Sequence, residues 1–123
     1  MSMRLRVPPV DDPDFVADYD ERARVLKLIG SADNATAPRL AELFGELHGE
    51  LAAKHATRLV IDMRALDHLG ASCVGELVTW LEKLEDLPER YAIVVRSNPS
   101  IGWQRTTLPA LSCFDPAFVT VET

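Results

Sequence analysis

The sequence predicts an α/β fold built on a mostly parallel sheet of four to five strands. Two short, nearly continuous apolar runs, RLVID at 58–62 and YAIVV at 91–95, have the length and composition of buried strands. Longer segments at 36–56 and 72–86 carry apolar residues three or four positions apart, which indicates amphipathic helices. Strands that alternate with helices along a chain are typical of parallel sheets, because each helix returns the chain to the same end of the sheet.

Composition limits the classes of function. The 123 residues, 47% of them apolar, fit one globular domain. The net charge of −6 argues against a nucleic-acid partner and against attachment to an anionic membrane. No apolar run approaches the roughly 18 residues of a membrane-spanning helix, and the N-terminus lacks the apolar core of a signal peptide. We therefore expect a cytoplasmic protein without membrane insertion.

Residues 1–23 form a strand or connector that we assign to the same domain as residues 24–123. MRLRV could be a short strand, PPVDDPD is rich in turn residues, and FVADYDERA could form a helical turn or a strand of an edge hairpin. The aspartates of this stretch lack the Gly and Glu spacing of a calcium loop, so we expect a solvated acidic loop and no metal.

The first strand and helix follow. RVLKLI at 24–29 alternates charged and apolar residues, as strands do, and Gly30 with the polar SADNAT should end it. Thr36 or Ala37 would cap the next helix, with Pro38 in its first turn. His48 and His55 are expected at the surface. One face of this helix carries Leu40, Leu43, Phe44, Leu47 and Leu51.

The central stretch from Arg58 to Leu84 contains the most informative pattern. RLVID at 58–62 should be a strand, residues 63–71 a loop, and residues from Ser72 an amphipathic helix ending before Pro88. Its apolar face would carry Val74, Leu77, Val78, Leu81 and Leu84. A helix N-terminus just beyond the carboxyl end of a strand is where α/β proteins usually hold ligands and modifications. A site is therefore expected at this loop.

The last third predicts a strand at 91–95, a short helix and a final strand at 118–121. Asn98 could cap the short helix, with Pro99 at its first position. Trp103 is either an exposed contact or an edge of the core. Arg64, Arg96 and Arg105 could line an anion site, although scattered arginines are usually solvated.

The sequence shows no motif of catalysis or cofactor binding. It has no GxGxxG, P-loop or GxSxG pattern, no CxxC pair and no cluster of histidines at metal-ligand spacing. No nucleophile and base stand in a recognisable arrangement. Cys73 and Cys113 lie far apart in a chain without an export signal, so reduced thiols are favoured over a disulfide. We expect no cofactor, no metal and no enzyme activity.

Four features follow one another in an order that resembles a known family. They are a strand ending at Gly30 with Asp33 and Thr36–Ala37 before a Leu-rich helix, the strand LVID with Leu66 behind it, a strand-to-helix loop ending at Ser72, Val74 and Gly75, and YAIVV with a short helix and strand behind it. Together, from about Arg24 to Val121, they resemble the STAS domains, named for sulfate transporters and anti-sigma factor antagonists. We accordingly expect a single STAS-like domain whose helices pack mainly on one face of the sheet.

The family motif at the central loop is only partly present. The usual sequence is Asp-Ser-Ser/Thr-Gly-Leu-Gly, and the chain has, in that order, Gly70, Ala71, Ser72, Cys73, Val74 and Gly75. In antagonists of this kind, a kinase that is also the anti-sigma factor phosphorylates a Ser or Thr of the motif. The unmodified antagonist binds that kinase and frees the sigma factor. The usual acceptor is Ala71 here, which has no hydroxyl, and the family Asp is missing, with Asp67 three residues earlier.

Ser72 and Cys73 each allow two interpretations. Ser72 is expected to be the helix N-cap, and phosphorylation of its hydroxyl stays open, because a phosphoryl group gains from the N-terminal amides and dipole of a helix. Cys73 is expected to be a small buried apolar residue, although a thiol beside a helix N-terminus can have a lowered pKa.

The resemblance implies a non-catalytic interaction module in bacterial signal transduction and transcription regulation. Its partner would be an anti-sigma factor or kinase-like regulator, bound through the loop 64–72 and the start of the helix 72–86, and a homodimer stays open. The alternative is a STAS domain that accompanies a transporter or binds a small ligand or nucleotide. The residues expected at the partner surface are Asp33, Asn34, Asp67, His68, Leu69, Gly70, Ala71, Ser72, Cys73 and Gly75.

Overall fold

The computed structural model describes residues 14–113 and 117–122, and in them a five-stranded sheet with the strand order β1-β2-β3-β4-β5. β1 pairs with β2 antiparallel and every other neighbouring pair is parallel, so the α/β prediction of a mostly parallel sheet is confirmed. The elements are β1 (Phe15–Asp20), β2 (Val25–Ala32), the 3-10 turn η1 (Asn34–Thr36), α1 (Ala37–Ala53), β3 (Arg58–Leu69), α2 (Ala71–Glu85), β4 (Ala92–Arg96), α3 (Gly102–Thr107), the 3-10 turn η2 (Leu108–Cys113) and β5 (Val119–Glu122).

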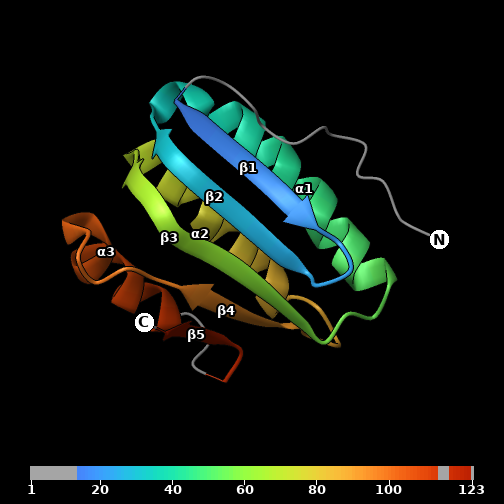
Figure 1. The fold of residues 1–123 in the computed structure, drawn as a ribbon. Helices are drawn as coiled ribbons and strands as arrows, with labels where there is room; N and C mark the ends of the chain where they lie inside the picture. Colours follow the sequence, from blue (N-terminus) through green and yellow to red (C-terminus); the bar gives the residue numbers. More distant parts are fainter. Residues whose placement is uncertain (1–13, 114–116, 123) are drawn as a thin grey trace.

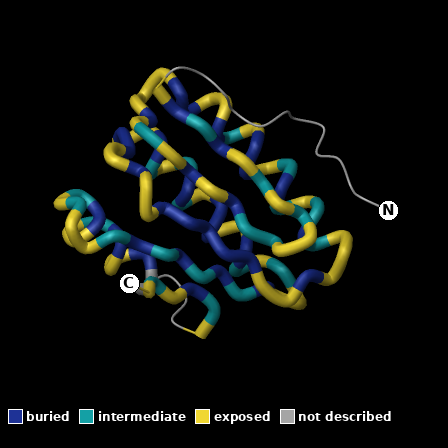
Figure 2. Tube along the Cα trace, viewed as in Figure 1, coloured by how far each residue is buried: buried dark blue, intermediate teal, exposed yellow. Residues whose placement is uncertain are grey.

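The two long helices lie side by side on one face of the sheet (Figure 1). The face of α1 predicted from its leucines is buried, as are the positions of α2 that point to the sheet. On α2, Val74 and Val78 are only half-buried, whereas Cys73 and Trp80 are fully buried. Buried positions follow the middle of the sheet and recur along the helices (Figure 2). The expectation that the helices pack mainly on one face is therefore confirmed.

The segment before residue 24 contributes the edge strand β1. Of the two alternatives for FVADYDERA, the structure has the edge hairpin. The carboxylate of Asp20 accepts hydrogen bonds from the backbone N–H groups of Arg22 and Ala23, which closes the turn to β2. The predicted strand MRLRV and the connector behind it lie outside the described residues.

β2 does not end at Gly30 as predicted, but continues to Ala32. Gly30 has a φ of +97°, and a Cβ there would lie 2.2 Å from the backbone oxygen of Asp14. A left-handed backbone conformation and a close chain approach both favour glycine. The glycine therefore marks an irregular position within the strand and not its end.

β3 is the largest departure from the sequence prediction. The residues assigned to the loop 64–72 are mostly strand, because β3 runs twelve residues to Leu69. Its pairing with β2 shifts twice, between Lys27 and Ile29 and again between Gly30 and Ser31, and each time β3 has one residue more. Such bulges break the alternation of a strand. The spacing between buried residues of β3 therefore changes from two positions to three. These buried residues are Leu59, Ile61, Met63, Leu66 and Leu69.

Side chains from the α3 region complete the far half of β3. β4 pairs with β3 only over Arg58–Asp62, which leaves later backbone carbonyls of β3 without a strand partner. Gln104, 2% exposed, donates from Nε2 to the carbonyl oxygens of Met63 and Leu66 at 2.7 and 3.0 Å. Trp103 Nε1 also donates to the oxygen of Leu66. These side chains replace a strand on a buried edge.

The C-terminal elements begin later than predicted. α3 begins at Gly102 with Ile101 as its cap, and Asn98 instead accepts a hydrogen bond from the N–H of Ser100 and donates to the oxygen of Arg64. The last strand is β5, one residue later than expected at both ends. No described helix is long and apolar enough to cross a membrane.

Candidate functional site at the junction of β3 and α2

The end of β3, the start of α2 and the turn η1 meet where the strands β2 and β3 end. The N–H of Gly70 donates to the oxygen of Ala32 at 2.7 Å, and the thiol of Cys73 donates to the oxygen of Asp33 at 3.1 Å. Ala32 pairs with Leu69, the last residue of β3. Segments that are more than thirty residues apart in the sequence are thus connected by hydrogen bonds.

Gly70, and not Ser72, is the N-cap of α2, so the predicted capping role of Ser72 is wrong. Ser72 is the second residue of the helix, and its N–H donates to the side-chain oxygen of Asn34 at 3.1 Å. An Asn oxygen is a good partner for a free N–H at a helix start. The cap is therefore supplied by a residue 38 positions away, which no local pattern could indicate.

Gly70 is required by the closeness of this contact. A Cβ at this position would lie 2.6 Å from the side-chain oxygen of Asn34 and 3.0 Å from its backbone nitrogen. The backbone itself is ordinary, with a φ of −65°. The lack of room for a Cβ atom, and not the backbone conformation, therefore restricts position 70 to glycine.

The predicted site residues divide by exposure into two groups. Asp33, Asn34, Asp67, His68, Ala71, Ser72 and Gly75 are exposed. We call these seven residues the junction surface. Leu69, Gly70 and Cys73 are buried beneath it, with Cys73 fully enclosed. The structure thus gathers all ten predicted residues at one edge, seven of them accessible to a partner.

The junction contains three side chains that the sequence raised as chemically reactive candidates, His68, Ser72 and Cys73. No hydrogen bond between the side chains of His68, Ser72 and Cys73 occurs among the described residues. Burial raises the pKa of the Cys73 thiol, and the nearby carboxylate of Asp33 adds to the effect. A buried thiol with a raised pKa is a poor nucleophile, which agrees with the apolar role expected for Cys73. Within 14–113 and 117–122 no three His, Cys, Asp or Glu side chains could hold a metal ion.

Of the three arginines proposed for an anion site, Arg64 and Arg96 lie beside the same carboxylate, Asp62, and no contact joins Arg105 to them among the described residues. Arg64 forms a two-pronged ion pair with Asp62, Arg96 lies 3.6 Å from a carboxylate oxygen of Glu122, and Arg105 donates to the backbone oxygen of Pro99. Each guanidinium has its own acceptor, which leaves no shared anion site.

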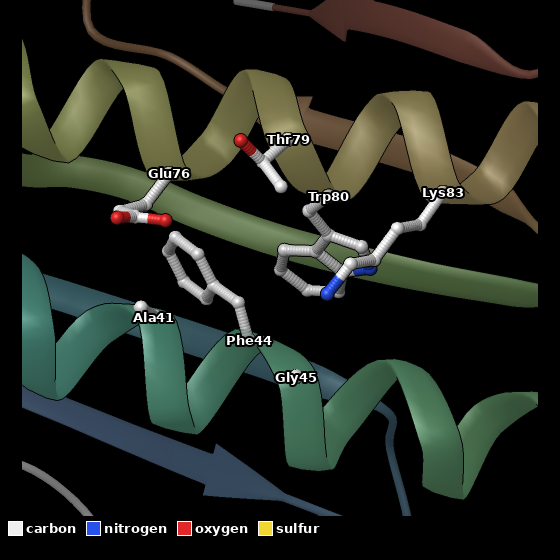
Figure 3. Close-up of a pocket in the computed structure, with 7 residues that line it drawn as sticks. All are labelled: Ala41, Phe44, Gly45, Glu76, Thr79, Trp80 and Lys83. Atoms are coloured by element: carbon white, nitrogen blue, oxygen red, sulfur yellow. The ribbon is translucent and has the colours of Figure 1, made fainter.

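Hollows also lie away from the junction surface among the described residues. One, of about 350 Å³, opens on the sheet face opposite α1 and α2 and is lined by Lys27, Leu28, Ile29, Asp62, Arg64 and Ala65. Another, of about 70 Å³, lies between α1 and α2, where the rings of Phe44 and Trp80 form its floor (Figure 3). Glu76 and Lys83 stand toward its two ends in that view.

His48 belongs to a network that the sequence did not reveal. The expectation of a plain surface residue is wrong, since its Nδ1 lies 2.6 Å from the hydroxyl of Tyr91, a residue only 1% exposed. The same hydroxyl accepts a hydrogen bond from Nε1 of Trp80 at 2.7 Å. The proton of the Tyr91 hydroxyl can be donated to His48 when Nδ1 is unprotonated.

Comparison with known proteins supports the fold. No model of a protein family matches the chain, and no curated protein sequence matches it. The crystal structure of an anti-sigma factor antagonist from Mycobacterium paratuberculosis is similar over 93% of this chain and 92% of that one, with a TM-score of 0.64 and 23% sequence identity. The five-stranded sheet with its helices, and the order of the elements around the junction, thus have the fold of an anti-sigma factor antagonist.

Proposed function

We propose that this chain is a non-catalytic interaction module of the anti-sigma factor antagonist kind, acting in the bacterial cytoplasm. It binds a protein regulator, an anti-sigma factor or a related kinase, through the junction surface. The observation that carries the proposal is that seven of the ten residues expected at the partner surface lie exposed at one edge, on a fold shared with an anti-sigma factor antagonist.

The geometry of the junction suits binding by a preformed surface. Asn34 and Asp33 hold the start of α2 through the backbone of Ser72 and the thiol of Cys73. A surface held in this way loses little conformational entropy when a partner docks. The buried members of the predicted set, Leu69, Gly70 and Cys73, position the contact residues above them.

Phosphorylation is the second part of the proposal. Ala71, exposed at the position of the usual acceptor, has no hydroxyl, so the switch does not operate there. Ser72 is exposed in the first turn of α2, where free amides and the helix dipole would favour a phosphoryl group. The carboxylate of Asp33, next to Cys73, opposes it. We propose binding that is independent of phosphorylation at position 71.

A pull-down from native cell lysate, read by mass spectrometry with phosphosite mapping, tests this function. We expect the wild-type protein to capture an ATPase-fold regulator. Ser72→Asp adds a negative charge to the junction surface, and Ser100→Asp adds the same charge at an exposed position outside it. If Ser72 is a switch, Ser72→Asp alone loses the regulator; if binding is independent of it, both variants retain the regulator.

Capture of transporter subunits, or of no regulator at all, would contradict the proposed function. Circular dichroism of each variant separates loss of the partner from loss of the fold.

A further inference from the structure

The sheet face opposite α1 and α2 carries one row of charges that crosses all five strands. Cross-strand partners run from Asp18 to Lys27, from Lys27 to Asp62, from Asp62 to Arg96 and from Arg96 to Glu122. The charges alternate in sign from one edge of the sheet to the other. This charged row does not involve the junction surface or the proposed function.

Every member of the charged row points away from the helices. The neighbours of each member along its own strand belong to the core or pack against it, as Ala17, Leu26, Ile61, Val95 and Val121 do. Successive strand residues point to opposite faces. No described helix covers this face (Figure 1).

Ion pairs lie beside the row and within it, between Arg64 and Asp62 and between Arg96 and Glu122. The Arg64 guanidinium, with a smaller contribution from Arg96, lowers the pKa of the Asp62 carboxyl, which is 7% exposed. Arg96 and Glu122 form an ion pair at 3.6 Å. Opposite charges on directly paired strand residues stabilise a sheet.

Apolar residues flank the middle of the charged row, and Asp20, Thr120 and Arg64 lie beside them on the same face. On one side Val25, Val60 and Val94 are cross-strand partners in a second row. On the other side Val16 pairs with Ile29, which is 42% exposed. Without the charges of Lys27 and Arg96 the middle of the face would be more apolar, and exposed apolar surface associates with other proteins. Two such faces could stack as sheets do, about 10 Å apart.

We propose that the charged row keeps this sheet face from stacking on a second copy of the chain. The row reads negative, positive, negative, positive, negative from either edge. A two-fold axis over β3 and parallel to it would place Asp18 on Glu122, Lys27 on Arg96 and Asp62 on itself. A two-fold axis along the row would place every charge on its own copy. Both symmetric arrangements oppose the like charges of Asp18, Lys27, Arg96 and Glu122. Asp62 adds little to this repulsion, because it is buried and paired with Arg64.

Stacking shifted by one strand does not remove the penalty. It would set opposite charges together but enclose them, and desolvation of buried ion pairs cancels most or all of their attraction. It would also leave an edge strand uncovered. The row therefore disfavours self-association through this face in each of these arrangements.

Sedimentation equilibrium of a charge-neutralised variant tests the inference. Lys27→Met with Arg96→Met joins the flanking apolar rows, and we expect its self-association constant to rise at least tenfold over wild type. Arg22→Met with Lys54→Met removes the same charges from exposed positions outside the face and should behave as wild type. Equal constants for the two double variants would overturn the proposal.

Two further variants identify the face and guard against loss of fold. Adding Ile29→Glu to the first double variant should restore the wild-type constant, because it returns a charge to the same face. Association that persists would place the contact elsewhere and overturn the proposal. If the double variant unfolds, Lys27→Met alone is tested, because Lys27 is exposed and the single change perturbs the fold less. We expect it to raise the self-association constant, and no rise would overturn the proposal.

Discussion

Gly70 shows how one residue without a side chain fixes the junction. The turn η1 approaches it so closely that the side-chain oxygen of Asn34 can reach the N–H of Ser72. A larger residue would push the turn away from α2 and remove the cap. The sequence indicated a helix start here, but not the contact, because Asn34 lies on a distant segment.

Gly70→Ala should lower the free energy of unfolding by about 1–3 kcal/mol, since its Cβ would overlap Asn34. Gly75→Ala is the matched control within the same helix. A Cβ there meets nothing within 4 Å, and alanine is the better helix former, so stability should rise by about 0.5–1 kcal/mol. Urea denaturation measures both. Equal effects of the two substitutions would show that the approach of η1 is not restrictive.

The network of His48, Tyr91 and Trp80 predicts a pH dependence of stability. Burial, followed by the charge of Lys83, lowers the pKa of His48 below its usual 6.5. The unfolded chain then binds more protons than the folded one between the two pKa values, so stability falls as the pH falls through this window. The contribution is fully present above the unfolded value and is lost as the pH drops through the folded one.

His48→Asn keeps an acceptor near the Tyr91 hydroxyl but does not titrate. From about pH 8 to about pH 5, its free energy of unfolding should decrease less than that of wild type. His55→Asn is the control, because His55 is exposed and only approaches Glu89 at 3.5 Å. A wild-type slope in His48→Asn, measured by denaturant titration at several pH values, would refute the assignment.

Among the elements, β3 has a first part that the sequence predicts and a second part that it does not. Its first five residues were predictable because they are nearly all apolar. The rest was not, because two bulges change the spacing of Met63, Leu66 and Leu69 from two to three, a period that no regular strand has. Partners on β2 decide the register, and a single sequence does not display them.

α3 is short, yet its Gln104 side chain forms hydrogen bonds with backbone carbonyls of β3 that have no strand partner. Gln104→Leu would leave the oxygen of Met63 without its donor and the N–H of Asn98 without its acceptor. Unpaired buried groups are costly, and we expect a loss of about 2–3 kcal/mol in the free energy of unfolding.

Arg105→Leu, at the next and exposed position, should change stability by only about 0.5 kcal/mol in the same urea titration. A loss for Gln104→Leu no larger than this would mean that α3 does not support β3. The sequence placed a helix here but could not show that its buried glutamine serves the edge of a strand that ends 35 positions earlier.

For the whole molecule, the alternation of predicted strands and helices was enough to predict an α/β fold with a mostly parallel sheet. The packing of the helices on one face was an expectation from the resemblance to STAS domains. The junction was also predictable as a location, since it follows from the carboxyl end of a strand and a helix start. The division of its residues into exposed contacts and buried supports was not predictable, because it depends on how η1 packs against α2.

The junction surface is the surface that we propose to bind the partner. The most direct measurement compares wild type with Ala71→Arg, which adds a large side chain at an exposed position of the first turn of α2, in the same pull-down. Ala53→Arg, exposed at the far end of α1, is the control. We predict that capture of the regulator falls at least tenfold in Ala71→Arg and is unchanged in Ala53→Arg. Full capture by a folded Ala71→Arg protein would contradict the account.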